Sequence, residues 1–225
     1  MPVPTLDVDG WSVCFTDRRD GDFGPSSVGV AERRAAIVGY LPVAWLRQTH
    51  GSGVVLFAGP HAVGQLAGAD GDAAVTDAPG VALCVVTADC APIAIVAGHV
   101  GAVVHAGWQG LLSGVIEAAV AAVGRLAGPD ASPRAVLGPC IHPGSYAFGA
   151  DDLDRVAARY GEQVRSHTVD GRPALDLPGA VEAALSAVQV PVSLAWNTDT
   201  SSPSLYSHRT RADPERQAMF LWRDR

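Results

Sequence analysis

The chain has 225 residues, of which 48% are hydrophobic and 17% charged, a balance that excludes a disordered protein and fits one domain over residues 1–225. No apolar run reaches the roughly 20 residues that cross a bilayer, and the first residues lack the basic and apolar regions of a signal peptide. We therefore expect a cytoplasmic protein without a membrane partner.

The charge distribution argues against nucleic acid as a partner. Lys and Arg number 16 and Asp and Glu number 23, which gives a formal net charge of −7. The one basic cluster contains Arg209, Arg211 and Arg216. Surfaces that bind nucleic acid need many cations to neutralise phosphates, so this composition favours small-molecule chemistry.

Short apolar runs separated by turn residues predict the elements of the first part of the chain. In order, these are a strand at Trp11–Phe15, a helix within Ser27–Tyr40, strands at Val43–Gln48 and Val54–Ala58, a surface loop at Gly59–Gly71, and an alternating segment at Asp72–Asp77. We expect Arg33 and Arg34 on the solvent side of the helix.

The central stretch carries the residues that suggest chemistry. Three strand-length apolar runs, at Val81–Thr87, Pro92–Ala97 and Val100–Val104, follow one another closely. Cys90 falls just past the first run and His105 just past the third. Ligands often gather at strand ends in α/β sheets, so we expect the functional site here.

The remaining chain alternates helices and strands without a regular βαβ period. We expect, in order, a helix at Ser113–Ala127, a strand at Arg134–Leu137, helices at Asp151–Tyr160 and Leu177–Val188, and strands at Pro191–Trp196, Ser204–Ser207 and Ala218–Trp222. This pattern predicts a single-domain, mixed-sheet α/β sandwich.

A metal site is one interpretation of the residues at these strand ends. His50 occupies the same kind of position as Cys90 and His105, and two imidazoles with one thiolate leave a fourth position open, as in catalytic zinc sites. The spacings of 40 and 15 residues match no compact zinc motif. The alternative is a buried structural cysteine beside two hydrogen-bonded histidines. The four cysteines are far apart and are expected to be reduced thiols or metal ligands.

Several sequence blocks together resemble one family. They are Gln48-Thr49-His50-Gly51, Asp72-Ala73 with Val75-Thr76, Thr87-Ala88-Asp89-Cys90-Ala91-Pro92, His105-Ala106-Gly107-Trp108-Gln109-Gly110, Gly138-Pro139-Cys140-Ile141, Tyr206-Ser207-His208-Arg209 and Arg216-Gln217-Ala218. In this order, from about Phe15 onward, the chain resembles the laccase-domain family, also called YfiH-like or polyphenol oxidase. The resemblance implies the YfiH-like type of α/β sandwich, with zinc bound by His50, Cys90 and His105.

The resemblance also implies an activity. Members of this family are associated with phosphorolysis of adenosine, inosine, guanosine and methylthioadenosine and with hydrolytic deamination of adenosine. Purine nucleosides and phosphate would then be the small-molecule partners. Other members are linked to editing of peptidoglycan precursors, by removal of a misincorporated L-serine. The preferred nucleoside and the oligomeric state stay open.

Specific roles follow for a few further residues. Asp89 is expected to transfer a proton or to orient a metal ligand, unless it only holds the strand end. Arg18, in a block similar to the family's FxxR segment, and Arg209 are candidates for the phosphate, with surface ion pairs as the alternative. The expected catalytic group is thus Asp89, Cys90, His105 and Arg18. The expected substrate-binding group is Arg18, Gln48, Trp108, Cys140 and Arg209. Trp108 either stacks on a purine or packs against the start of the helix. Cys140 either lines the pocket or packs internally.

Three segments depart from the family pattern. An Asn-Leu segment is missing between Gly21 and Gly29, the usual Cys-Thr pair reads Asp199-Thr200, and the usual double arginine reads Arg209-Thr210. These changes leave the proposed metal residues intact and bear on substrate preference and the phosphate site.

Three other functions compete with the nucleoside enzyme. A copper oxidase of phenols is disfavoured, because the only methionines are Met1 and Met219 and no His-x-His pair exists. Cys90 could act instead as a nucleophile with His105 as its base, in an amide hydrolase. A binding module without catalysis leaves the Asp89-Cys90 pair at a strand end without a purpose.

Overall fold

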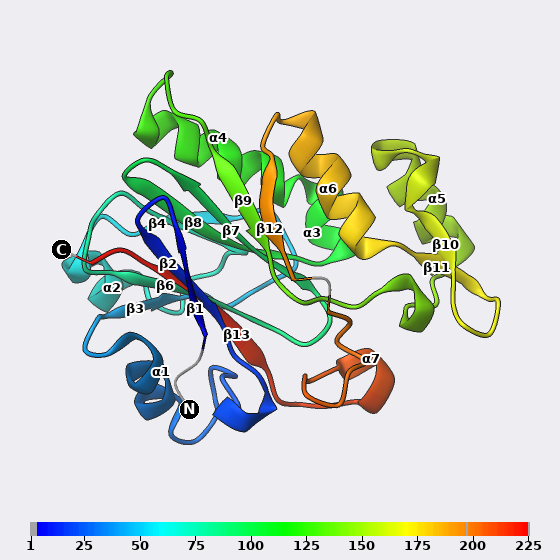
Figure 1. Cartoon of the computed structure of the whole chain (residues 1–225), viewed down its shortest axis with the longest axis horizontal. Helices are drawn as coiled ribbons and strands as arrows, with labels where there is room; N and C mark the ends of the chain where they lie inside the picture. Colours follow the sequence, from blue (N-terminus) through cyan, green and yellow to red (C-terminus); the bar gives the residue numbers. More distant parts are fainter. Residues whose placement is uncertain (1–3, 197, 225) are drawn as a thin grey trace.

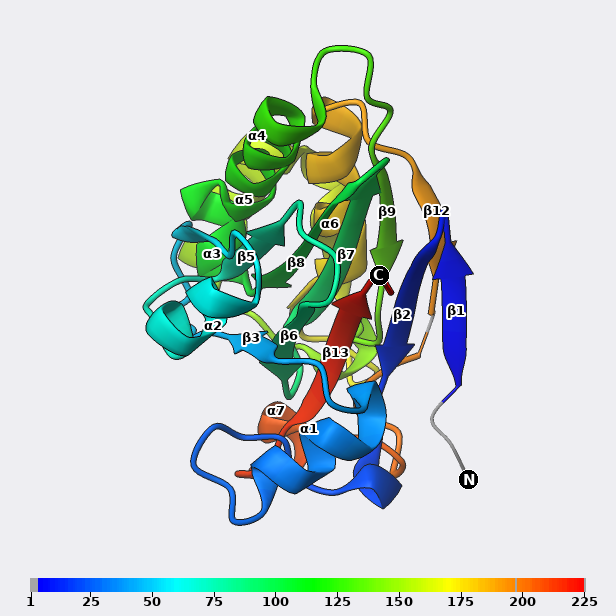
Figure 2. The ribbon, with the colours of Figure 1, turned by 90° about the vertical axis from the view of Figure 1, so that its left-hand side faces the viewer.

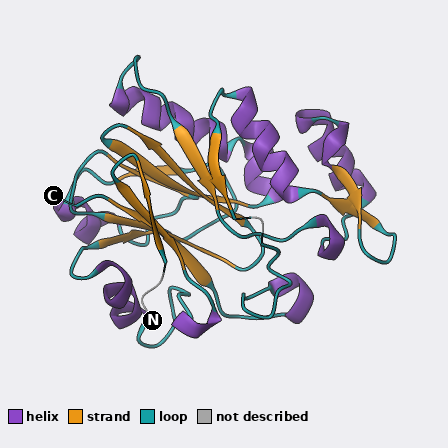
Figure 3. Cartoon of the chain, in the orientation of Figure 1, coloured by secondary structure: helices purple, strands orange, loops and turns teal. Residues whose placement is uncertain are grey.

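Two mixed β-sheets packed face to face form the centre of the protein (Figures 1 and 3). The structure, a computed structural model, describes residues 4–196 and 198–224, with the side chains of residues 193–195 left out. The six-stranded sheet has the order β12 (Val192–Ala195), β9 (Arg134–Leu137), β7 (Ala91–Ala97), β8 (Val100–Ala106), β5 (Ala73–Thr76) and β4 (Val54–Leu56). The five-stranded sheet has the order β1 (Thr5–Val8), β2 (Trp11–Phe15), β13 (Gln217–Trp222), β6 (Ala82–Thr87) and β3 (Val43–Trp45).

Helices cover the outer faces of both sheets (Figure 2). The helices are α1 (Val30–Val38), α2 (Pro60–Leu66), α3 (Trp108–Ser113), α4 (Val115–Ala127), α5 (Ala150–Tyr160), α6 (Leu177–Ala187) and α7 (His208–Arg211). Helices α3, α4 and α6 pack on the six-stranded sheet, α5 packs on α3 and α6, and α1 packs on the five-stranded sheet. A small hairpin of β10 (Arg165–His167) and β11 (Pro173–Leu175) lies beside α5. The layers are therefore helix, sheet, sheet and helix, which confirms the mixed α/β sandwich.

The central hairpin of β7 and β8 shows how the apolar sequence leads to a sheet that is covered on both faces. Every residue of β7 and β8 is buried, because one face of this sheet meets the helices and the other meets the second sheet. Strands buried on both faces are continuous apolar runs, and these two runs have that character. Gly98 and His99 form the tight turn between them, and Gly98 adopts a φ of +56° that favours glycine.

Two chain crossings between the sheets determine where the site lies. Strand β6 belongs to the five-stranded sheet and the next strand, β7, to the six-stranded sheet, so residues 88–90 carry the chain from one to the other. Residues 46–53 make the same crossing between β3 and β4. Because β3 runs parallel to β6, both crossings occur at the same end of the sandwich. Cys90 and His50 lie on these two crossings.

The structure differs from several of the elements and positions that the sequence predicts. The segment Gly59–Gly71 contains helix α2, which begins with a proline at its first position, a favourable place for that residue. Residues 204–207 form the end of a turn and irregular backbone instead of a strand. The helix expected at Ser113–Ala127 is confirmed as α4, which begins two residues later because Gly114, with a φ of +82°, separates it from the preceding short helix α3. Arg34 is not on the solvent side, because only 7% of its surface is exposed.

Among the described residues, no helix is long and apolar enough to cross a membrane.

The close packing of the two sheets leads to a stability prediction for two glycines. A Cβ atom at Gly101, on β8, would lie 2.7 Å from the indole carbons of Trp11, whereas one at Gly124, on α4, would meet nothing within 4 Å. We expect Gly101→Ala to destabilise the protein by about 1–3 kcal/mol through overpacking. Gly124→Ala should stabilise it by about 0.5–1 kcal/mol through helix propensity. Urea unfolding of both variants checks this, and equal free energies of unfolding would contradict it.

Candidate metal centre and its cavity

His50, Cys90 and His105 converge at the end of the sandwich where the chain crosses between sheets. Their ligand atoms lie within 4.8 Å of one another. The two imidazole rings meet edge to face, with 4.8 Å between ring centroids. The three residues come from the two crossings and from β8, where His105 pairs with Pro92. The predicted group is therefore assembled in space although its members are far apart in sequence.

The electrostatics of this group favour a thiolate. Burial opposes ionisation of Cys90, but the imidazoles of His105 and His50 outweigh it and lower the pKa of the thiol to about 6. Burial would also lower the pKa of His105, whereas Cys90 and Asp72 raise it to about 9. In the absence of a metal, we therefore expect the half-buried Cys90 and the buried His105 to form a thiolate–imidazolium pair.

Asp72 holds the two imidazole-bearing segments in place. Its fully buried carboxylate accepts a 2.8 Å hydrogen bond from His105 Nδ1. It also accepts from the backbone N–H groups of Thr49, His50 and Gly51 and from the Thr49 hydroxyl. Burial opposes ionisation, but the hydrogen bonds from His105, Gly51 and Thr49 lower the pKa of Asp72 to about 2. An ionised carboxylate only accepts, so Nδ1 carries a proton, and when the ring is neutral Nε2 of His105 is left to bind a metal.

Gly107 allows the start of α3 to approach the cluster. A Cβ atom at this position would lie 3.0 Å from Cys90 Sγ and 3.2 Å from a ring carbon of His50. Any larger residue would displace the sulfur or the imidazole. The glycine therefore keeps the space that the three ligands share.

A cavity of about 580 Å³ opens onto the cluster. Its wall contains all three converging residues and two aromatic rings, Trp108 and Tyr146. Both rings contact Phe148 edge to face, at centroid distances of 5.4 and 5.2 Å. Aromatic faces beside a metal-ligand group suit a planar heterocycle.

Several cations also line the cavity. Arg209 donates to the Ala147 carbonyl and lies over the Tyr146 ring, and Arg216 donates to backbone carbonyls. Neither guanidinium is paired with a carboxylate in the described part of the chain. Arg47, by contrast, is paired with Asp70. Arg209 and Arg216 therefore make this part of an acidic protein attractive to anions.

Asp89 lies on the cavity wall, and its carboxylate is engaged with the C-terminal segment. Its carboxylate accepts hydrogen bonds from the hydroxyls of Thr200 and Ser207 and from the backbone N–H of Arg209. All three donors belong to the C-terminal segment, and Asp89 has a strained φ of +103°. The carboxylate thus fixes the segment that carries Arg209 instead of reaching a metal ligand.

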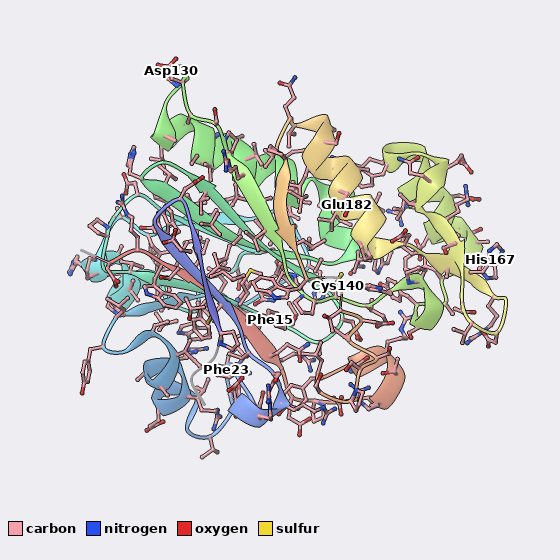
Figure 4. All side chains as sticks on the ribbon, viewed as in Figure 1. Phe15, Phe23, Asp130, Cys140, His167 and Glu182 are labelled. Carbon is pink, nitrogen blue, oxygen red and sulfur yellow. The ribbon has the colours of Figure 1, made fainter. Side chains whose placement is uncertain are left out.

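Three other predicted site residues offer no unpaired polar group to the cavity, and for Arg18 and Cys140 this agrees with the ion-pair and packing alternatives stated above. Arg18 is absent from the cavity wall, because its guanidinium is paired with Asp213 and stacks on Tyr206. Cys140 lies in the middle of the fold, where burial raises the pKa of its thiol (Figure 4). Gln48 lies on the wall, but its amide is engaged with both backbone groups of Val86. Trp108 and Arg209 do line the cavity.

Sequence reasoning missed Asp72, Tyr146 and Arg216 as contributors to the site. Asp72 is recognised as a partner of His105 only when β5 is seen to pair with β8, with Ala73 opposite Val104. Tyr146 follows a short 3₁₀ turn at Pro143–Ser145 and carries no motif beyond an aromatic residue in a loop. Strand register and loop conformation bring these residues to the site, and a local sequence pattern predicts neither of them.

Comparison with known proteins places the chain in a family. A family model described as multi-copper polyphenol oxidoreductase laccase matches residues 23–224. The chain therefore belongs to this laccase-domain family, and the resemblance noted in its sequence is confirmed.

Relatives and solved structures agree with this assignment. A Streptomyces griseus protein named purine nucleoside phosphorylase is 36% identical over 212 residues, which cover 89% of this chain and 83% of the relative. A Xylella fastidiosa protein of the same name is 37% identical over 243 residues, which cover 99% of this chain and 92% of the relative. The crystal structure of a Neisseria meningitidis protein of the DUF152 family matches with a TM-score of 0.85 and 26% identity over 100% of both chains. The crystal structure of Bacillus licheniformis YfiH matches with a TM-score of 0.85 and 21% identity, and the match covers 99% of this chain and 97% of that protein. The YfiH-like fold is thereby established.

The Asp72 contacts predict a specific defect in metal binding. Asp72→Asn replaces an acceptor-only group with an amide that no longer fixes His105 or gathers the His50 segment. We expect zinc affinity to fall by about 10- to 100-fold. Competition with a chromophoric chelator measures this, and Asp70→Asn, two residues away but exposed and paired only with Arg47, is the matched control. Equal zinc affinity in the two variants would exclude the proposed positioning by Asp72.

The lowered pKa of Cys90 predicts selective alkylation. Since the thiolate is the reactive form, metal-free protein at pH 7 should react with iodoacetamide at Cys90, and the rate should fall as the pH drops below about 6. Cys14 and Cys84 should resist, because burial raises their pKa values to about 12. Mass spectrometry of intact and digested protein locates the adduct. Zinc should protect Cys90, and labelling that is equal at all cysteines would contradict the electrostatic description.

Proposed function

We propose that this chain is a zinc-dependent purine nucleoside enzyme, which phosphorolyses adenosine, inosine, guanosine and methylthioadenosine and also deaminates adenosine by hydrolysis. One observation carries the proposal: the His50–Cys90–His105 group forms part of the wall of a cavity of about 580 Å³. Cavities of this size hold drug-sized ligands, which include nucleosides. The names of the two relatives support the same assignment.

The chemistry of the three side chains suits zinc. One thiolate and two neutral imidazoles are usual zinc ligands, and three protein ligands leave room for a substrate or water. Bound zinc would act as a Lewis acid and would lower the pKa of a water molecule. Asp72 fixes the His105 tautomer needed for this role.

A multicopper cluster fits less well. In residues 4–196 and 198–224, His50, Cys90 and His105 are the single group of three or more His, Cys, Asp or Glu side chains with converging donor atoms. A trinuclear copper cluster needs more imidazoles than these two. We therefore keep polyphenol oxidation as the least favoured function, despite the description of the family.

The remaining wall residues supply binding. Trp108 and Tyr146 offer ring faces to the purine, and Arg209 and Arg216 offer guanidinium groups to phosphate. Asp89 acts in this proposal as a positioning residue for Arg209, through the hydrogen bond to its backbone N–H. Arg18, Gln48 and Cys140 leave the substrate-binding group, because their polar atoms are paired or lie outside the cavity.

Product analysis tests the function directly. Purified zinc-loaded protein is incubated with adenosine, with and without phosphate, and the products are separated by chromatography. Adenine with ribose 1-phosphate indicates phosphorolysis, and inosine indicates deamination. Cys90→Ala should abolish both, by at least about 1000-fold, since it removes the anionic ligand. Turnover by this variant at the wild-type rate would refute the assigned site.

An amide hydrolase that edits peptidoglycan precursors is the second candidate, and one observation favours it. Cys90, His105 and Asp72 form a thiolate, an imidazole and an orienting carboxylate, which is also the order of groups in cysteine hydrolases. Metal content separates the candidates. If metal-free protein releases L-serine from a precursor that carries it, and zinc inhibits the reaction, the thiolate is the nucleophile and the nucleoside proposal fails.

The unpaired cations predict a phosphate-specific defect. Arg209→Met removes a guanidinium without a carboxylate partner, so the KM for phosphate should rise by about 10-fold or more while the KM for nucleoside changes little. The matched control combines Arg47→Met with Asp70→Asn and removes a neutral ion pair next to the same cavity. Steady-state kinetics with varied phosphate measure both. A larger effect in the control than in Arg209→Met would place the phosphate elsewhere.

A further inference from the structure

Arg34 is a buried arginine outside the active-site cavity that lacks a hydrogen-bond acceptor. It lies on α1, which covers the outer face of the five-stranded sheet (Figure 2). Only 7% of the residue is exposed. Its Nε and Nη2 atoms are shielded from solvent and have no hydrogen-bond partner in the described part of the chain. Buried guanidinium groups are normally paired, so this one calls for a partner.

Among the residues that the structure describes, none provides a counter-charge for Arg34. The guanidinium carbon lies 5.0 Å from the centroid of the Trp45 ring, a cation–π contact. The ionisable group that acts on Arg34 is the Cys84 thiol, and burial raises the pKa of that thiol to about 12, so it is neutral at physiological pH. Burial also lowers the pKa of Arg34. The site is therefore electrostatically incomplete.

A pocket of about 280 Å³ adjoins this side chain. Arg34 and Trp45 line it together with Leu41, Val43 and Tyr40, and its remaining walls are alanine and glycine. No acidic residue and no second cation belong to this wall. The pocket is separate from the active-site cavity, because Val43 and Trp45 face α1 while Ala44 and Leu46 belong to the core between the sheets.

The geometry of the guanidinium indicates what could bind. The Nε–H and the adjacent Nη2–H point the same way along one edge of the planar group, and this edge matches the two oxygens of a carboxylate. Both nitrogens of this edge are shielded in the structure, so a carboxylate reaches them only when the Arg34 side chain turns towards the pocket, and no hydrogen bond among the described residues opposes that rotation. A single cation suits a single negative charge, and the aromatic and aliphatic walls suit an apolar body.

We propose that this pocket binds a small organic monocarboxylate, with its charged end on the Nε–Nη2 edge of Arg34 and its apolar body against Trp45 and Leu41. The site is independent of the nucleoside chemistry. It would be a second ligand site, on the far side of the five-stranded sheet from the core that the two sheets share.

Titration of the full-length protein with benzoate tests the proposal. The ¹⁵N-labelled Arg34 Nε–H signal and the Trp45 indole signal are followed by NMR, and each is assigned by its loss in Arg34→Met and Trp45→Phe. We expect both signals to shift saturably at millimolar benzoate. Benzyl alcohol, which has the same ring without the charge, and inorganic phosphate, which has charge without the ring, should bind at least about 10-fold more weakly.

Variants separate the site from a general effect of charge. Arg34→Met should abolish the benzoate response of Trp45, and Arg125→Met, an exposed cation on α4, should retain it. Arg34→Lys keeps the charge without the two-pronged edge and should weaken binding several-fold. Nucleoside turnover should be unchanged in all three. The absence of a saturable shift in the wild type, equal binding of phosphate, or a retained Trp45 response in Arg34→Met would each overturn the proposal.

Discussion

The buried carboxylate of Asp72 is the interaction on which the candidate metal centre depends. A carboxylate without solvent contact is tolerated only when its oxygens are well paired, and Asp72 receives five hydrogen bonds. Four of them come from residues 49–51 and one from His105, so a single charge joins a loop to a strand. The two imidazoles consequently take their positions from the same group, and a change at Asp72 affects both together.

The sandwich itself brings the third ligand to them. Cys90 lies where the chain leaves the five-stranded sheet for the six-stranded one, and the parallel pairing of β3 with β6 places the His50 crossing beside it. Tight crossings need unusual backbone, and His50 and Asp89 both have positive φ values, of 59° and 103°. Asp89 compensates by accepting three hydrogen bonds from the C-terminal segment. That segment is anchored because β13 lies between β2 and β6.

How much of this could be predicted depends on whether a feature is local. The fully buried strands β7 and β8 are visible in the sequence as apolar runs, and the three metal-ligand candidates stand out as reactive residues next to such runs. The partner of His105 is not visible, because it is set by the register of β5 on β8. The engagement of Gln48 with Val86 and the pairing of Arg18 with Asp213 join residues 38 and 195 positions apart. Arg34 was misplaced for a related reason, since helical periodicity alone did not show which face α1 turns to the sheet.

Cys90, His105 and Asp72 can support either a metal site or a cysteine nucleophile, and His50 helps to distinguish these two roles. A cysteine nucleophile needs one base and one orienting carboxylate, and His105 and Asp72 would suffice. A second imidazole that also lowers the pKa of Cys90 adds nothing to that pair, whereas it completes a three-ligand set. Gly107 points the same way, because it leaves room where Cys90 and His50 meet, and a nucleophile has no need for His50 to approach the sulfur. The combined placement of Cys90, His50, His105 and Gly107 therefore favours a metal-binding role for the thiolate.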